Sequence, residues 1–183
     1  AIVGGRVSAI DISWTKTGKI YIGTSTGRIL TTTNNGTNWA TQTGFAYVSD
    51  FTVDQGNDNI CYATLGGTGG THVLKTTNGG TNWVNITSNM PNIAANSVVL
   101  RTAAPRMIIV GTDIGVFQSV DEGASWISFN SGMPVNEVYD MKYKQAAGII
   151  LVATHGRGCW TFDLGSVLGT DPYSVIPKTF ELS

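Results

Sequence analysis

Charged residues are scarce in this sequence, and their scarcity excludes several kinds of partner. Only 13% of its 183 residues are Asp, Glu, Lys or Arg, and the net charge is −1; globular proteins usually carry about 25%. A chain this close to neutral has no basic field to attract nucleic acid or an acidic membrane surface. No apolar run approaches the roughly 18–20 residues of a membrane-spanning helix. We therefore expect no nucleic-acid partner and no membrane span.

Cysteine and histidine are also rare. Two cysteines, Cys61 and Cys159, and two histidines are too few for a disulfide framework or a structural zinc site. One disulfide is arithmetically allowed, but each cysteine lies at an apolar position of an expected strand, so two small buried thiols are the better interpretation. The sequence predicts no cofactor and no metal cluster. Calcium bound by turn oxygens stays open, although no ligand pattern supports it.

What the sequence does contain is one eight-residue pattern that occurs three times. Its consensus is Ser/Thr-x-Asp/Asn-x-Gly-x-x-Trp, and its tryptophans stand at positions 39, 83 and 126, so the period is 44 and then 43 residues. A repeat of this length indicates a propeller or a similar array. The pattern residues are Thr32, Asn34, Gly36 and Trp39, then Thr76, Asn78, Gly80 and Trp83, then Ser119, Asp121, Gly123 and Trp126.

The same order of short strands surrounds each copy of the pattern. We call the eight-residue pattern the box. An alternating stretch, a turn and an apolar run come first, followed by a second turn and a short strand on either side of the box. Alternation, β-branched residues and turns rich in Gly, Asn or Pro are typical of strands, and no segment has helical periodicity. Four strands per roughly 44 residues is the pattern of a propeller blade. The sequence therefore predicts an all-β β-propeller, with blades at about 6–47, 48–94, 95–137 and 138–164.

Two further segments carry a family resemblance together with the boxes. Residues 111–119 read Gly-Thr-Asp-Ile-Gly-Val-Phe-Gln-Ser and residues 153–160 read Ala-Thr-His-Gly-Arg-Gly-Cys-Trp. With the boxes, they resemble Asp-box (BNR-repeat) β-propellers, a family that includes sialidases, xyloglucan-degrading glycosidases, sortilin-type receptors and many bacterial surface proteins. The resemblance covers about residues 6–164 and implies the fold. Because enzymes and binding proteins share the box, it does not decide the function.

The boxes themselves are expected to be structural turns. Their short Asn, Asp, Ser and Thr side chains can accept main-chain N–H groups within a hairpin turn. The three box glycines are expected at positive φ, which other residues resist. The box tryptophans are expected to pack between neighbouring sheets. In the resembled family these turns lie on the face away from the ligand.

The fourth repeat departs from the pattern. Phe162 and Leu164 stand where the box would have Ser/Thr and Asp/Asn, so we expect neither a box nor a fourth strand there. The chain is then either the C-terminal part of a six- to eight-bladed propeller, or a small ring in which 1–3 supply the last outer strand. We favour the first account, because the resembled family usually has six or more blades. An open arc of four blades would expose sheet faces at both ends, which calls for missing upstream blades or an oligomeric partner.

Residues 165–183 lose the repeat and are predicted to be a linker or tail, because they are rich in Gly, Ser and Pro. The end, Ile-Pro-Lys-Thr-Phe-Glu-Leu-Ser at 176–183, resembles the segment before the sorting domain of type IX secretion cargo from Bacteroidetes, Chlorobi and Ignavibacteria. The start, Ala-Ile-Val-Gly-Gly, lacks the features of a signal peptide, so any export signal was removed or lies upstream. The resemblance implies a location outside the cell or on its outer surface.

The family resemblance places a ligand face on the loops between second and third strands and on the segments that enter each first strand. Mapped onto this sequence, it offers His155, Arg157, Asp113, Glu137, Tyr139, Tyr47 and His72. His155 with Arg157 fits an anionic or sugar ligand, although Gly-Arg-Gly is also an ordinary tight turn. His72 ends a loop, 65–72, that is four or five residues longer than its counterparts, and such insertions often carry recognition.

Two carboxylates are the candidates for catalysis. Asp50 and Asp140 occupy equivalent places on first strands, where the first repeat has Ala9. Paired carboxylates can serve glycoside hydrolysis, but solvated or turn-bonding carboxylates are the commoner case. Five scattered arginines do not supply the arginine cluster of a sialidase, and the Gly-rich loop lacks the Lys of a phosphate-binding loop.

The sequence thus favours a secreted or cell-surface, non-catalytic propeller module that binds other protein chains or surface glycans. The alternative is a polysaccharide-active glycoside hydrolase of the xyloglucanase kind, or its remnant, with Asp50 and Asp140 as acid and base. A folding or assembly helper of the same architecture is a third hypothesis.

Overall fold

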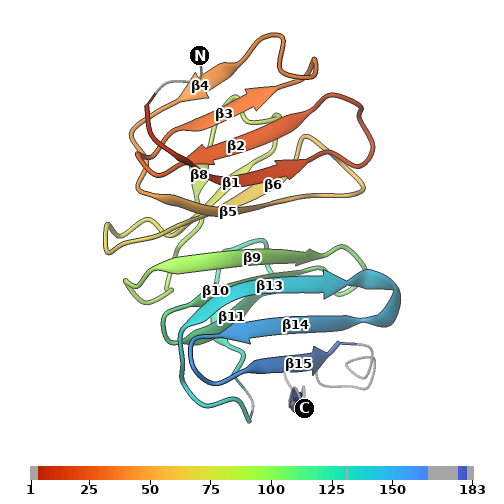
Figure 1. Ribbon diagram of the computed structural model, residues 1–183. Helices are drawn as coiled ribbons and strands as arrows, with labels where there is room; N and C mark the ends of the chain where they lie inside the picture. The colour runs from red at the N-terminus through yellow and green to blue at the C-terminus, as the bar shows by residue number, and fades with distance from the viewer. Residues whose placement is uncertain (1–3, 131, 165–176, 181–183) are drawn as a thin grey trace.

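The computed structural model describes residues 4–130, 132–164 and 177–180 (Figure 1). Within them the chain forms four antiparallel sheets of four strands, one after another along the sequence. The first sheet holds β1 (Val7–Ile12), β2 (Ile20–Thr24), β3 (Ile29–Thr32) and β4 (Ala40–Gln42), and the second holds β5 (Val48–Val53), β6 (Cys61–Leu65), β7 (Val73–Thr76) and β8 (Val84–Asn85).

The third and fourth sheets repeat this order. The third holds β9 (Ala95–Arg101), β10 (Met107–Thr112), β11 (Gly115–Ser119) and β12 (Ile127–Ser128). The fourth holds β13 (Val138–Lys144), β14 (Ile149–Thr154), β15 (Cys159–Asp163) and β16 (Pro177–Phe180), with one short 3-10 turn, η1 (Gln145–Ala147), between β13 and β14. The prediction of an all-β chain with four blade repeats is confirmed.

The fourth strand of the last sheet corrects one expectation. The sequence predicted no outer strand there, yet β16 pairs with β15 so that Cys159 lies opposite Phe180. An outer strand needs main-chain pairing along one edge rather than a box, and residues beyond the repeat supply it. The alternative donor, residues 1–3, and most of the segment that resembles secretion cargo lie outside the described residues.

The innermost strands β1, β5, β9 and β13 carry the same irregularity, which aligns the repeats. Each has a bulge after its first residue, and pairing resumes with Ala9 opposite Gly23, Asp50 opposite Thr64, Ser97 opposite Gly111 and Asp140 opposite Ala153. These four pairs are therefore equivalent. The prediction that Ala9 takes the place of Asp50 in the first repeat is confirmed.

The inner strands contact one another in chain order, β1 with β5, β5 with β9 and β9 with β13. Figure 1 shows them in the middle of the molecule, with the first sheet at the top and the fourth at the bottom. Apolar side chains fill the three spaces between successive sheets, each in a separate cluster. No helix among the described residues is long and apolar enough to cross a membrane.

The two cysteines are both free. Cys61 is buried, as expected, whereas Cys159 on β15 is only half-buried. The prediction of two buried thiols is thus right for the second sheet and only partly right for the fourth, because β15 belongs to the last sheet of the described arc.

Candidate functional site

The three boxes form one turn geometry. In the first, the Thr32 hydroxyl donates to Asn34 Oδ1 at 2.9 Å and accepts the N–H of Gly36 at 3.1 Å, while Asn34 Oδ1 accepts the N–H of Asn38 at 3.0 Å. The second and third boxes repeat these bonds. The three box glycines have φ of 82°, 89° and 89°, as expected. In the third box, hydrogen bonds from Ser125 and Ser119 lower the pKa of Asp121 to about 2.

The second and third box tryptophans contact the preceding sheet. The ring of Trp83 lies edge-on to Tyr21 of the first sheet, with centroids 6.2 Å apart. Trp126 is 3% exposed, and its indole N–H donates to the carbonyl of Ile86 in the second sheet at 2.8 Å. Trp39 belongs to the first sheet, and its indole N–H donates to Gly36 of its own box at 3.0 Å. The second and third boxes therefore join successive sheets, and all three boxes are structural turns.

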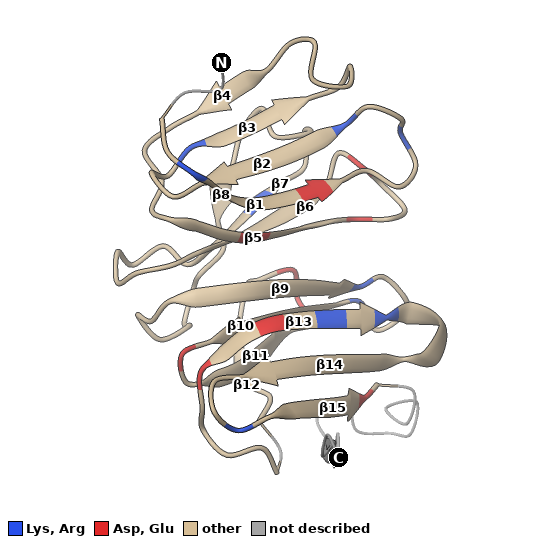
Figure 2. Cartoon of the chain, in the orientation of Figure 1, with Lys and Arg blue, Asp and Glu red and all other residues tan. Residues whose placement is uncertain are grey.

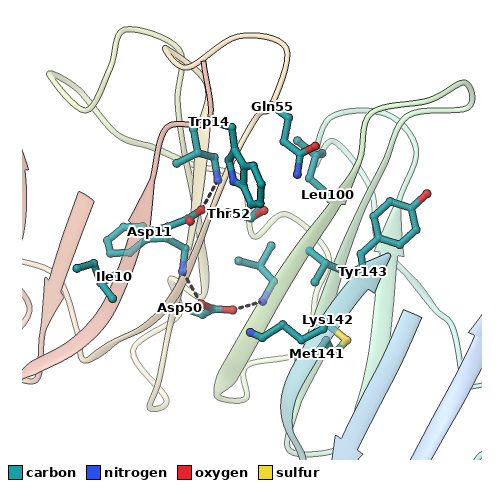
Figure 3. Close-up of a pocket in the computed structure, with 14 residues that line it drawn as sticks. Ile10, Asp11, Trp14, Asp50, Thr52, Gln55, Leu100, Met141, Lys142 and Tyr143 are labelled. Carbon is teal, nitrogen blue, oxygen red and sulfur yellow. Dashed lines mark hydrogen bonds between the residues drawn. The ribbon is translucent and has the colours of Figure 1, made fainter. Parts of the chain in front are cut away.

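A cleft of about 200 Å³ runs between the four inner strands (Figure 3). Asp11 and Asp50 face it from β1 and β5, and Lys142 extends toward Asp50 from β13. Trp14, which is 74% exposed, and Tyr143 flank it. All four repeats contribute, so the arrangement of the inner strands creates this cleft.

Asp11 and Asp50 bridge neighbouring inner strands. Asp11 accepts the N–H of Ile12 on its own strand and, with its other oxygen, the N–H of Val53 on β5, both at 2.8 Å. Asp50 accepts the N–H of Phe51 at 2.8 Å and that of Val98 on β9 at 3.0 Å. Both oxygens of each carboxylate are thus held by main-chain donors of two sheets.

Burial shifts both carboxylates toward their neutral forms. It raises the pKa of Asp50 to about 6, although the N–H groups of Val98 and Phe51 and the charge of Lys142 lower it. Burial raises the pKa of Asp11 as well, although the N–H groups of Val53 and Ile12 and the charge of Lys142 lower it. A carboxyl that titrates near neutral pH can act as an acid or a base. Here, however, each oxygen is already used to join strands.

Asp140, the second catalytic candidate, differs from Asp50. Its Oδ1 accepts both the N–H of Met141 at 2.8 Å and the ammonium of Lys142 at 2.9 Å. Its Oδ2 has no hydrogen-bond partner in the part of the chain that the structure describes, and its side chain is 54% exposed. Asp140 is close enough to raise the pKa of Asp50 by its charge, but less than burial does.

Sequence reasoning missed three residues of the cleft, namely Asp11, Trp14 and Lys142. Asp11 and Lys142 are equivalent positions on β1 and β13, two residues after Ala9 and Asp140. A search along the whole alternating strand, rather than at its entry, could have found them. Trp14 had a signal too, because it is a tryptophan outside any box, directly after the first strand.

The ligand-face candidates of the third and fourth sheets lie near the start of the inner strands of those sheets. In the fourth sheet His155 Nδ1 lies 3.4 Å from Glu137 Oε2, and the His155 ring stands edge-on to Tyr139 at 5.4 Å. Arg157 is exposed next to this group. In the third sheet, exposed Asp113 accepts a hydrogen bond from Asn96 Nδ2 at 2.9 Å.

The two candidates from the second sheet have different surroundings. Tyr47 is 46% exposed, and its carbonyl accepts the N–H of Gly66 in the expanded loop. His72 is fully buried, and its Nε2 lies 2.8 Å from Asn92 Oδ1. A buried histidine cannot meet a ligand at the surface, so His72 holds the loop in place instead. Over the described residues no cluster of three His, Cys, Asp or Glu side chains could hold a metal ion.

The first sheet exposes apolar side chains whose counterparts in the second sheet are buried. Val7, Ile10 and Ile12 on β1 are 56%, 61% and 53% exposed. The pairing registers make them equivalent to Val48, Phe51 and Val53 on β5, which are at most 4% exposed because they pack on the first sheet. We call Val7, Ile10 and Ile12 the first end face.

The fourth sheet shows the opposite half of the same interface. Ile149 and Leu151 on β14 are 38% and 42% exposed, whereas the equivalent Met107 and Ile109 on β10 are fully buried against the fourth sheet. Figure 2 shows that charges are few and that β13, beside β14, carries both signs. We call Asp140, Ile149 and Leu151 the last end face.

No protein-family model matches the chain, and no curated protein matches it. Solved structures do match. The chain is similar to the GH74 xyloglucanase of Xanthomonas campestris, with 14% identity, a TM-score of 0.69 and 95% of this chain covered. It is similar to the Swd1 β-propeller domain of Myceliophthora thermophila at 11% identity and a TM-score of 0.72, over 95% of this chain and 58% of that one.

A third similar structure is the computationally designed Ika8 protein, with 14% identity, a TM-score of 0.62, and 88% of this chain and 47% of that chain covered. The chain spans only 23–30% of the GH74 enzymes that it matches. At these identities the likeness concerns the fold alone. The fold is an arc of a β-propeller.

Proposed function

We propose that this chain is a non-catalytic β-propeller module that assembles with other protein chains through its two end faces. One observation carries the proposal. Positions that are buried between sheets inside the arc are half exposed in the first and last sheets. Fully burying a Val, Leu or Ile side chain stabilises a complex by about 1.5–3 kcal/mol, so five such side chains offer a substantial driving force.

The chemistry of the end faces favours a protein as the partner. Val7, Ile10, Ile12, Ile149 and Leu151 are aliphatic, and a sugar has few groups that aliphatic faces recognise. Contiguous apolar surface of this kind is typical of protein–protein interaction sites. The sheets that such a partner would meet already pack face to face three times within the chain.

Photo-crosslinking tests this proposal without knowledge of the partner. A photoreactive residue would replace Ile10 or Leu151 in the protein produced by its own cell, with Val84 as the matched control because it is 62% exposed on β8. We expect protein adducts from positions 10 and 151, and few from position 84. Equal yields from all three positions would contradict assembly through the end faces.

We further propose that the chain acts outside the cell or on its outer surface. The support is the resemblance of 176–183 to type IX secretion cargo. Fractionation of the producing cell is the test. The protein is expected in the medium or the outer-surface fraction, and recovery from the cytoplasm alone would contradict this location.

A polysaccharide ligand is the second candidate, and the inner-strand cleft is the observation that favours it. Trp14 is exposed beside the cleft and could stack on a sugar ring, while Asp50 has a pKa of about 6. A glycoside hydrolase would release reducing sugar from xyloglucan and lose that activity in Asp50→Asn and Asp140→Asn. A glycan-binding module would bind without cleavage and lose affinity in Trp14→Ala. No binding and no cleavage by the full chain would exclude both.

A further inference from the structure

Lys19 occupies a position that is apolar in the other three sheets. The pairing registers that make Gly23 equivalent to Gly111 also fix the equivalents of Lys19. These equivalents all have apolar side chains: Ile60, Met107 and Ile149. Lys19 is nevertheless only 2% exposed. Because burial strips an ammonium group of water, a lysine is almost never buried without a partner, and the partners of Lys19 indicate its role.

The polar partners of Lys19 come from the turn before β6. Lys19 Nζ donates to Asn59 Oδ1 at 3.1 Å and lies 3.6 Å from Asp58 Oδ2. That Asp58 oxygen is buried and has no hydrogen-bond partner within the described residues. Figure 1 shows the turn between β1 and β2 and the turn between β5 and β6 on the same side of the molecule. An amine of the first sheet thus meets an amide and a carboxylate of the second sheet at one point.

The surrounding main chain holds the amide and the carboxylate in place. The carbonyl of Asn59 accepts the N–H of Gly79 at 2.9 Å, and the Tyr21 hydroxyl donates to the carbonyl of Asp58 at 3.1 Å. Gly79, in the second box, also closes over the pair of side chains. A Cβ there would lie 2.9 Å from Lys19 Nζ and 3.3 Å from Asn59 Oδ1, so a larger residue would push the two groups apart.

These contacts meet the two requirements for a reaction between an amine and an amide. The first is proximity: Asn59 Cγ is bonded to the oxygen that Lys19 Nζ contacts, so the amine lies beside the carbon that it would attack. Holding two reacting groups in contact makes their reaction intramolecular and strongly favours it. The second is a neutral amine. Burial lowers the pKa of Lys19, although the charge of Asp58 raises it, and Asp58 Oδ2 is placed to take the proton.

We infer that Lys19 and Asn59 form a covalent amide cross-link between the first and second sheets, with Asp58 as the proton carrier. Asp58 Oδ2 takes one proton from the Lys19 ammonium group. Lys19 Nζ then bonds to Asn59 Cγ, and the bond from Cγ to Nδ2 breaks. Nδ2 leaves with its bonding electron pair, one proton from Asp58 and one from Nζ, so the products are the new amide, an ammonium ion and the Asp58 carboxylate. No electron is transferred, and no co-reactant is needed.

The interface between the second and third sheets provides a contrast. There Arg106 lies 2.8 Å from Asp54 and 2.7 Å from Glu122, and the Tyr62 hydroxyl donates to Glu122 at 2.6 Å. Tyr62 is the equivalent of Tyr21. Since a guanidinium group keeps its proton in proteins, it cannot act as the attacking amine, and ion pairs alone join these side chains. The amide cross-link is therefore expected only between the first and second sheets, and it is independent of assembly through the end faces.

Mass spectrometry of a tryptic digest of the folded full chain tests the inference. Trypsin does not cleave after an acylated lysine, so the cross-link should yield the segment 17–28 joined to the segment 29–75. The intact chain should be lighter than its sequence by one ammonia molecule, about 17 Da. Separate segments 17–19, 20–28 and 29–75, together with an intact chain of full sequence mass, would overturn the inference.

A pair of lysine variants distinguishes the cross-link from ammonia loss elsewhere in the chain, such as ring closure at Asn78 before Gly79. Lys19→Met removes the amine and introduces the side chain that Met107 provides at the equivalent position, so the fold should be retained and the chain should have its full sequence mass. Lys16→Met is the matched control, because Lys16 is an exposed lysine of the same turn, and this variant should still be lighter by one ammonia molecule. An ammonia loss that persists in Lys19→Met would overturn the cross-link.

The role of Asp58 is tested by Asp58→Ala. Loss of a general acid and base should slow the reaction on the order of 100-fold or more, so the purified variant is expected to retain the full sequence mass. A cooperative thermal transition, measured for this variant and for Lys19→Met, shows that each is folded. Complete cross-linking of folded Asp58→Ala would overturn the assignment of Asp58 as the proton carrier.

Discussion

The interfaces inside the arc and the faces at its two ends are built from the same positions but meet different surroundings. Phe51 and Val53 on β5 are 4% exposed, whereas the equivalent Ile10 and Ile12 on β1 are 61% and 53% exposed. The repeat therefore specifies both halves of an interface in every sheet. In the described arc, the first and the last sheet each leave one half of an interface exposed.

The largest difference in stability between the two regions is expected when a box tryptophan is replaced. Trp126 is buried against the second sheet, so Trp126→Ala is expected to lower the free energy of unfolding by about 3–5 kcal/mol. Trp39→Ala removes a half-buried ring with no preceding sheet in the chain and should cost about 1 kcal/mol or less. Urea unfolding of both variants measures the two losses of stability. Equal losses of unfolding free energy in the two variants would contradict the expected difference between the internal interface and the first sheet.

An ion pair between two sheets should likewise contribute more to stability than an ion pair on the last sheet. Arg106 lies 2.8 Å from Asp54, which is 5% exposed, and 2.7 Å from Glu122, and so links the second and third sheets. Arg106→Leu leaves a buried carboxylate unpaired, which should cost about 2–4 kcal/mol of stability. Lys142→Leu removes an exposed partner of Asp140 on the last sheet and should cost less than about 1 kcal/mol. Thermal unfolding of the two variants measures this difference, and a larger loss for Lys142→Leu would contradict it.

The titration of Asp50 should make the stability of the folded chain depend on pH. Its pKa is raised from 3.8 to about 6 in the folded chain, so between these values the folded state binds a proton that the unfolded state has lost. Stability from this group is therefore complete below pH 4 and falls as the pH rises through 6, by about 1–3 kcal/mol. Urea unfolding from pH 4 to 7 should show a larger fall in the wild type than in Asp50→Asn, which keeps only the smaller contribution of Asp11. A constant difference between the two proteins over this range would contradict the raised pKa.

The smallest expected contrast concerns two box glycines. Gly36 and Gly80 have φ of 82° and 89°, so an Ala at either position has the same backbone cost. At Gly80 the new Cβ also overlaps Thr31 of the first sheet, whereas at Gly36 it meets only Trp39. Gly80→Ala should therefore be less stable than Gly36→Ala by about 1–2 kcal/mol. Equal melting temperatures of the two variants would contradict the expected overlap of the new Cβ at position 80 with Thr31.

Much of the fold could be predicted because the repeat is written in local signals. The spacing of Trp39, Trp83 and Trp126 gave the period, and turn residues gave the strand order. The outer strand β16 could not be predicted from the box, since it pairs through its main chain and lies beyond the repeat. Its partner strand β15 was predicted from the apolar pair Cys159 and Trp160.

The site was harder to predict because its groups act between repeats. The equivalence of Asp50 with Asp140 was visible in the sequence, but only the pairing of sheets reveals that Asp50 bonds Val98 on the next strand. Tertiary burial likewise made His72 a loop anchor rather than a surface group. The end faces were expected as a consequence of an open arc, although the residues that form them depend on the bulge that aligns the inner strands.

Hydroxyl-radical footprinting of the native preparation tests most directly whether the end faces are covered in the working protein. Ile10 and Val84 are aliphatic and 61% and 62% exposed in the single chain, so equal accessibility would give them similar rates of oxidation. Assembly through the end faces predicts that Ile10 and Leu151 are protected several-fold relative to Val84 at working concentration. Oxidation of Ile10 at the rate of Val84 would contradict that account.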